Sequence, residues 1–100
     1  MKGMSAGAKR RARSALSSRN GWVCHYCSKP LIPDGEWDTY CDKTRDGYSA
    51  RPGYSFPVLD HLTPSSRGGG NKIDNLVLSC DMCNMRKNDK TEPEFIDWLK

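Results

Sequence analysis

Four cysteines, grouped in two Cys-x2-Cys pairs, enclose an Asp-His dipeptide in this sequence. The pairs are Cys24/Cys27 and Cys80/Cys83, and the dipeptide is Asp60-His61. Four thiolates at this spacing form a ligand set for one tetrahedral zinc ion and fill its coordination sphere. Such an ion would join the two ends of the intervening chain and hold the residues between them. We therefore predict a structural zinc site without a catalytic role.

The alternatives for these cysteines are unligated buried thiols and two disulfides. A fifth cysteine, Cys41, makes the number odd, and no apolar signal-peptide core follows Met1, which favours zinc in a reducing compartment. No apolar run is long enough to cross a membrane. Only 36% of the 100 residues are hydrophobic, so the core is small, and a zinc site contributes roughly 10 to 16 kcal/mol to folding. We expect a cytoplasmic protein without membrane association, with Cys41 a packed or surface thiol.

The Asp60-His61 pair offers two groups that phosphodiester hydrolysis requires, a general base and a ligand for a cation. Histidine titrates near neutral pH, so His61 is the candidate base. The carboxylate of Asp60 is a hard oxygen ligand of the kind that Mg²⁺ prefers. Adjacent residues on a strand face opposite sides, so both reach one site only where the strand ends or twists. The alternative is a loop-end aspartate beside a surface imidazole.

The apolar pattern predicts two strands around a glycine-rich loop, followed by two short helices. We expect strands at 57–62 and 76–80, the loop at 63–72 and a helix at 81–88. A last helix at 92–99 is indicated by Thr91 as N-cap, with Glu94 three residues later. Its apolar residues are expected to fold back as core: Phe95, Ile96, Trp98 and Leu99. A short strand at 22–27 is expected to carry the first cysteine pair.

The first 19 residues are basic and contain no acidic residue. We predict a flexible arm at 1–19, with a helix around residues 8–16, ahead of one folded domain at 20–100. A basic segment on a slightly acidic body favours binding to a polyanion. Four residues are predicted to contact nucleic acid: Lys9, Arg10, Arg11 and Arg13. The alternative is a solvated tail.

No periodicity holds between residues 31 and 56, so we expect an irregular insertion there. Turn signals such as Asp46-Gly47 alternate with aromatic residues, among them Trp37 and Phe56. The aromatic rings have two interpretations, stacking on nucleic-acid bases or packing within the domain. We favour packing, because so small a domain has few other apolar side chains.

Four motifs together resemble the HNH endonuclease family. They are Asp60-His61-Leu-Thr-Pro, Gly68-Gly69-Gly70, Asn75-Leu76-Val77-Leu78 and Cys80-Asp-Met-Cys83-Asn84-Met-Arg86-Lys87. The resemblance extends in order from about Trp22 to Leu99. It implies a small α+β zinc-stabilised domain, in which the ββα-metal hairpin and helix are followed by a C-terminal helix. It also implies hydrolysis of phosphodiester bonds with one divalent cation.

The resemblance assigns roles to residues that flank the Asp60-His61 pair. Asn84 matches the helix-borne ligand of the cation, where many members of the family have histidine. This departure favours the oxygen-preferring Mg²⁺ or Mn²⁺ over softer metals. Asn75 is expected to fix the loop through hydrogen bonds, which is compatible with a simple Asx turn. Three basic residues are candidates for phosphate contacts, with solvated surface charges as the alternative: Arg67, Arg86 and Lys87.

The sequence therefore predicts a metal-dependent DNA endonuclease that nicks or cuts both strands. The alternative is a non-catalytic zinc-stabilised module that binds DNA or a protein partner. A purely structural interaction protein is a third reading, which the three motif positions disfavour. A homodimer, a protein partner and an RNA substrate all stay open. A phage or restriction setting is suggested by the resemblance alone.

Overall fold

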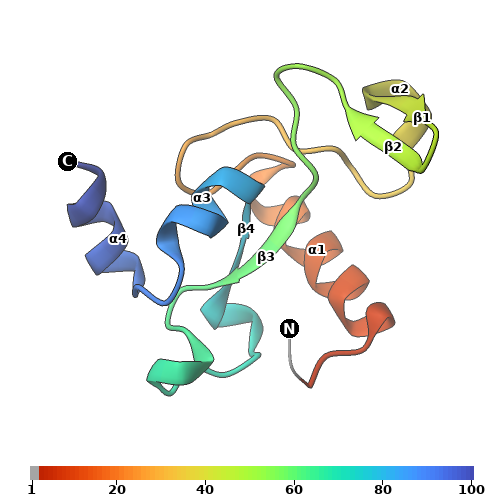
Figure 1. Ribbon diagram of the computed structural model, residues 1–100. Helices are drawn as coiled ribbons and strands as arrows, with labels where there is room; N and C mark the ends of the chain where they lie inside the picture. Colours follow the sequence, from red (N-terminus) through yellow and green to blue (C-terminus); the bar gives the residue numbers. More distant parts are fainter. Residues whose placement is uncertain (1–2) are drawn as a thin grey trace.

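A two-stranded antiparallel hairpin and the helix after it form the centre of the computed structural model, which describes residues 3–100. Strand β3 (Val58–His61) pairs with β4 (Leu76–Ser79), and helix α3 (Asp81–Lys87) begins two residues after β4. Every residue of β4 is buried, in keeping with its apolar run. Figure 1 shows α3 beside this hairpin. The predicted ββα arrangement is confirmed.

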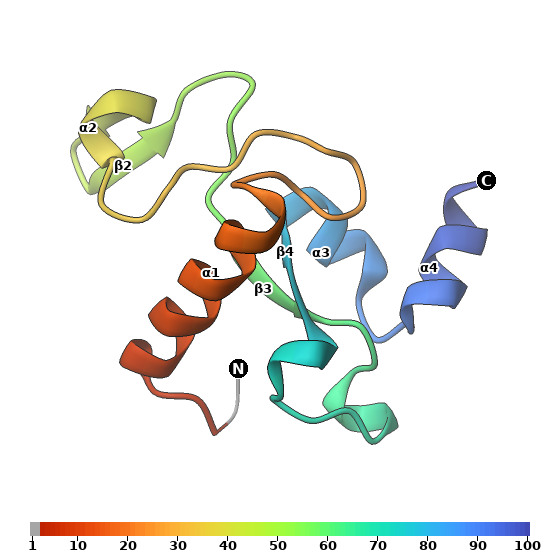
Figure 2. The same cartoon turned by 180° about the vertical axis from the view of Figure 1, so that it is seen from behind.

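Helix α1 (Ala6–Asn20) packs against β3 and β4, on the side seen in Figure 2. The structure thus differs from the flexible arm expected at residues 1–19, of which residues 1 and 2 lie outside the described part. Ala12 and Leu16 are four residues apart, share one face of the helix and are buried in the core. The side chain of Ser5 caps the helix by accepting a hydrogen bond from the Ala8 backbone N–H.

The segment from residue 31 to 56 is more regular than expected. It contains helix α2 (Trp37–Tyr40) and a hairpin of β1 (Cys41–Thr44) and β2 (Gly47–Ala50). Gly47 has a φ of 142° at the turn, a conformation that favours glycine. Four of the five aromatic rings in this segment pair with one another, as the packing interpretation predicted: Trp37 with Phe56, and Tyr40 with Tyr54. The fifth, Tyr48, is 44% exposed.

Helix α4 (Glu92–Leu99) has the predicted bounds and a complete Thr91/Glu94 capping box. Phe95 is fully buried and meets the ring of Tyr26 edge-on at 5.0 Å. The other three apolar residues were expected in the core, but Ile96, Trp98 and Leu99 are 44%, 53% and 46% exposed. Only one face of so short a helix packs against the rest of the domain, and Phe95 lies on that face.

Two shorter structures complete the described chain. The strand expected at 22–27 is reduced to a single bridge between Val23 and Pro30. The predicted glycine-rich loop includes a 3₁₀ turn, Ser65–Arg67, and a second turn, Ile73–Asn75, leads into β4. Across residues 3–100, no helix combines the length and apolarity needed to span a membrane.

Candidate zinc and catalytic sites

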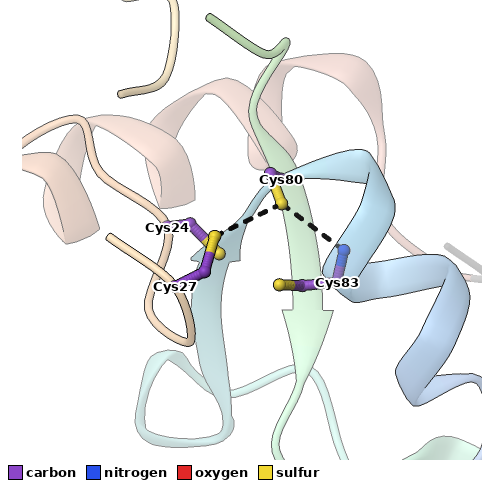
Figure 3. A group of neighbouring side chains, drawn as sticks. All are labelled: Cys24, Cys27, Cys80 and Cys83. Carbon is purple, nitrogen blue, oxygen red and sulfur yellow. Dashed lines mark hydrogen bonds between the residues drawn. The ribbon is translucent and has the colours of Figure 1, made fainter. Parts of the chain in front are cut away.

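The four paired cysteines come together in the structure, as their spacing predicted. Their Sγ atoms all lie within 4.8 Å of one another, and the group is drawn in Figure 3. Cys27 Sγ and Cys80 Sγ are 3.8 Å apart. A tetrahedral zinc ion with Zn–S bonds of about 2.3 Å separates its sulfur ligands by roughly 3.8 Å. The four side chains therefore fit one zinc ion, whereas Cys41 is buried elsewhere.

Local backbone geometry builds this cysteine cluster from two separate segments. The loop at residues 24–30 turns back through Ser28, whose φ is 63°. The backbone N–H of His25 donates to the carbonyl of Leu78, 2.8 Å away, and so fixes the loop to β4. Cys80 is the N-cap of α3, and its Sγ accepts a hydrogen bond from the Cys83 backbone N–H. The cluster therefore joins the loop, β4 and α3.

The surroundings of the thiols shift their pKa values in different directions. Burial acts to raise the pKa of Cys24, but backbone N–H groups of Cys80, Cys27 and Tyr26 outweigh it and lower that pKa to about 7. Burial raises the pKa of Cys80 and of Cys83. A zinc ion must displace the protons of its thiol ligands, so its binding weakens as the pH falls.

Three residues predicted to act in catalysis line one open hollow of about 350 Å³: Asp60, His61 and Asn84. Asp60 and His61 are the last two residues of β3. Because the strand ends here, the neighbours border the same hollow although a regular strand would separate them. Asn84 comes from α3, one residue after Cys83 of the cysteine cluster. The carboxylate and the amide are hard oxygen donors of the kind that suits Mg²⁺ or Mn²⁺.

Asp60 is only 5% exposed, and two neighbours contact the Oδ2 atom of its carboxylate. The Tyr26 hydroxyl donates to this oxygen at 2.6 Å, and Lys87 Nζ lies 3.4 Å from it. The pKa of Tyr26 is raised, mainly by burial and secondly by the contact with Asp60. The hydroxyl therefore keeps the proton that it donates. Neither Tyr26 nor its contact with Asp60 was expected from the sequence.

Lys87 differs from its predicted role as a phosphate contact. Its side chain is completely buried, and Nζ donates to the backbone carbonyl of His61 at 2.6 Å as well as pairing with Asp60. The last turn of α3 lies against β3, which directs this lysine beneath the strand rather than into solvent. A buried ammonium is tolerated there because it is both paired and hydrogen-bonded.

The imidazole of His61 is half-buried, and its Nε2 atom lies 2.8 Å from Oδ1 of Asn71. An amide oxygen only accepts hydrogen bonds, so this contact assigns the proton to Nε2 when the ring is neutral. The other nitrogen, Nδ1, is then unprotonated and able to accept a proton. No local sequence pattern indicates this role for Asn71, because the contact depends on how the glycine-rich loop folds back.

Asn75 fixes the loop between the two strands, the role expected for it. Its amide donates to the carbonyls of Thr63 and Gly70 and accepts from the Thr63 backbone N–H, over 2.8 to 3.0 Å. Gly69 passes so close to Thr63 that an added Cβ would lie 1.7 Å from its carbonyl oxygen. The loop is therefore tightly packed at Gly69, whereas an added Cβ at Gly68 or Gly70 would meet no atom within 4 Å.

Among the other basic residues predicted to contact nucleic acid, some form ion pairs and others are exposed. Arg67 pairs with Glu94 at 3.0 Å, although both side chains are about half exposed. Arg13 pairs with Asp34 at 2.9 Å, which ties α1 to the residues ahead of α2. Arg10, Arg11 and Arg86 are exposed. His25 is exposed, and its Nε2 atom pairs with the carboxylate of Glu92.

We expect removal of zinc with a strong chelator to unfold the domain, because the cysteine cluster joins segments that share a small core. Circular dichroism before chelation, after it and after zinc return measures the change. Cys80→Ser should lose bound zinc, whereas Cys41→Ser should keep one ion per chain. An unchanged spectrum after complete zinc removal would contradict a structural zinc.

Lys87→Met should destabilise the fold by about 3 to 5 kcal/mol, because it leaves the buried Asp60 without its cation. Arg86→Met is the matched control on the same helix. Its side chain is exposed, so it should change the free energy of unfolding by less than about 0.5 kcal/mol. Urea denaturation of both variants measures the difference, and equal stabilities would argue against the buried ion pair.

Comparison with known protein families agrees with this geometry. The HNH endonuclease family matches residues 39–100, which include β3, β4, α3 and α4. The match contains Asp60, His61, Asn75 and Asn84, whereas α1 and the first cysteine pair precede it. No curated protein matches the chain. Since the family match covers more than half of the chain, this protein belongs to the HNH endonuclease family.

Proposed function

We propose that this protein is a DNA endonuclease that hydrolyses phosphodiester bonds with one divalent cation, Mg²⁺ or Mn²⁺. The observation that supports it best is the meeting of Asp60, His61 and Asn84 at one hollow. These residues supply a base and two oxygen donors, which is the minimum that metal-assisted phosphodiester hydrolysis needs from a protein. Membership of the HNH endonuclease family favours the same chemistry.

Each side chain has a definite task in this proposal. His61 takes a proton from the attacking water through Nδ1, while Asn71 holds the ring through Nε2. Asp60 and Asn84 provide the oxygen atoms that hold the cation. When bound, the cation stabilises negative charge on the phosphate and on the leaving oxygen. Two further residues act on the backbone. Asn75 fixes the loop at Thr63, and Lys87 donates a hydrogen bond to the carbonyl of His61.

The path of the DNA is suggested by a second groove beside the hollow. This groove, of about 240 Å³, lies between α1 and β3 and is lined by Lys9, Arg13 and residues 57–59. Val58 and Leu59 line both cavities, so a strand whose scissile phosphate occupies the hollow can continue towards Lys9. Arg13 is already paired with Asp34, which makes Lys9 the stronger candidate for a phosphate contact here. Arg10 and Arg11 are exposed on other faces of the same helix.

We expect zinc-loaded protein to nick or linearise supercoiled plasmid with Mg²⁺ or Mn²⁺ and to be inactive in EDTA. His61→Ala should lower the cleavage rate about a hundredfold to ten-thousandfold, because it removes the general base. Asn84→Ala should raise the cation concentration needed for cleavage. His25→Ala is the control, since His25 is the other histidine of the chain and does not border the hollow.

Full activity of His61→Ala would contradict the assignment of the base. DNA binding by the unmutated protein without cleavage in either metal would instead favour a non-catalytic zinc module. Substrates of single-stranded DNA, duplex DNA and RNA, tested side by side, identify the preferred nucleic acid.

Lys9→Gln should weaken DNA binding and reduce the slope of log affinity against log salt concentration by about 1, the value for one lost phosphate contact. Arg19→Gln is the matched control on the same helix, because ten residues of α-helix separate the two positions by roughly 15 Å. Fluorescence anisotropy in EDTA across a salt series measures both slopes. Equal slopes for the two variants would remove Lys9 from the DNA path.

A further inference from the structure

One side chain connects the cysteine cluster with the hollow. Tyr26 lies between Cys24 and Cys27 in sequence, and its hydroxyl donates to Asp60 Oδ2 at 2.6 Å. Its ring packs edge-on against the fully buried Phe95, with 5.0 Å between ring centroids. Tyr26 is therefore fixed at both ends, by the backbone of the cysteine loop and by the carboxylate of Asp60.

We propose that Tyr26 is a positioning residue for the catalytic cation, through which the zinc-binding loop orients the carboxylate of Asp60. The inference rests on the proposed function, in which Asp60 is a ligand of that cation. It adds a role for a residue outside the part of the chain that matches the HNH family, residues 39–100.

The physical reason is the rotational freedom of an aspartate carboxylate. Rotation about its last side-chain bond is broad and roughly twofold, so the backbone alone does not fix which oxygen faces the hollow. Tyr26 and Lys87 both contact Oδ2 and thereby favour one orientation. Hydrogen-bonding partners of metal ligands typically contribute ten- to a hundredfold to metal affinity or activity.

Tyr26 and Lys87, which both contact Oδ2 of Asp60, differ in their other structural roles. Lys87 also holds the carbonyl of His61 and is completely buried, so its removal disturbs the strand itself. The Tyr26 hydroxyl can be removed alone, because phenylalanine keeps the ring against Phe95. Tyr26→Phe therefore isolates the orientation of Asp60 from the stability of the fold.

The test is the affinity of zinc-loaded protein for Mn²⁺ without DNA, measured by electron paramagnetic resonance of free Mn²⁺. We expect Tyr26→Phe to bind Mn²⁺ ten- to a hundredfold more weakly and to keep one zinc per chain. DNA affinity in EDTA should not change. The control is Tyr48→Phe, which removes a hydroxyl on β2 that also contacts a carboxylate, that of Asp38 in α2, and neither residue lines the hollow.

A second variant separates orientation from packing. Phe95→Leu loosens the support of the Tyr26 ring but keeps the hydroxyl, so it should lower stability and retain most of the Mn²⁺ affinity. The inference is overturned if Tyr26→Phe binds Mn²⁺ as the unmutated protein does, or if Phe95→Leu weakens binding equally. Failure of the unmutated protein to bind Mn²⁺ at all would contradict the proposed function itself, and the inference with it.

Discussion

The cysteine cluster is the constraint on which the rest of the structure depends. It joins a loop near the start of the chain to the first turn of α3, and its sulfur atoms lie within 4.8 Å of one another. Both Tyr26 and Asn84 are next to cysteines of this cluster in sequence. A zinc ion held by this cluster would therefore also fix the positions of Tyr26, which contacts Asp60, and of Asn84, which lines the hollow. The cysteine cluster, predicted to have a structural role, is thus directly linked to residues of the candidate catalytic site.

The second constraint is electrostatic and acts beneath β3. Asp60 and Lys87 are both buried, and each has a further hydrogen-bonding neighbour, Tyr26 and the His61 carbonyl. Burying two charges costs several kcal/mol each, and their attraction offsets this cost only where the geometry is good and further hydrogen bonds satisfy both groups. Here the Asp60–Lys87 pair fixes the side chain of Asp60 and the backbone carbonyl of His61. Across residues 3–100, every buried polar side-chain atom has a hydrogen-bond partner, which helps a small domain with few apolar residues to hold this geometry.

Sequence patterns predicted the parts of the fold whose signals are local. The strands around the glycine-rich loop, the capping box at Thr91 and the paired cysteines are examples. The docking of α1 was missed because Ala12 and Leu16 form a narrow apolar face among many basic residues. Tyr26 and Asn71 were missed for a different reason. Their contacts join residues 34 and 10 positions apart, and no spacing rule connects them.

The segment that precedes β3 closes on itself at its base. Leu31 bridges to Ser55, and the Ile32 backbone N–H donates to the Ser55 carbonyl at 2.9 Å. The two ends of the intervening chain are thus adjacent before the hairpin begins, and lengthening a closed loop adds little entropic cost. Residues 33–54 consequently leave and rejoin the domain at one place, and the Arg13–Asp34 pair is a further link from this segment to α1. A change in the length of this segment should therefore leave the register of β3 and β4 unchanged.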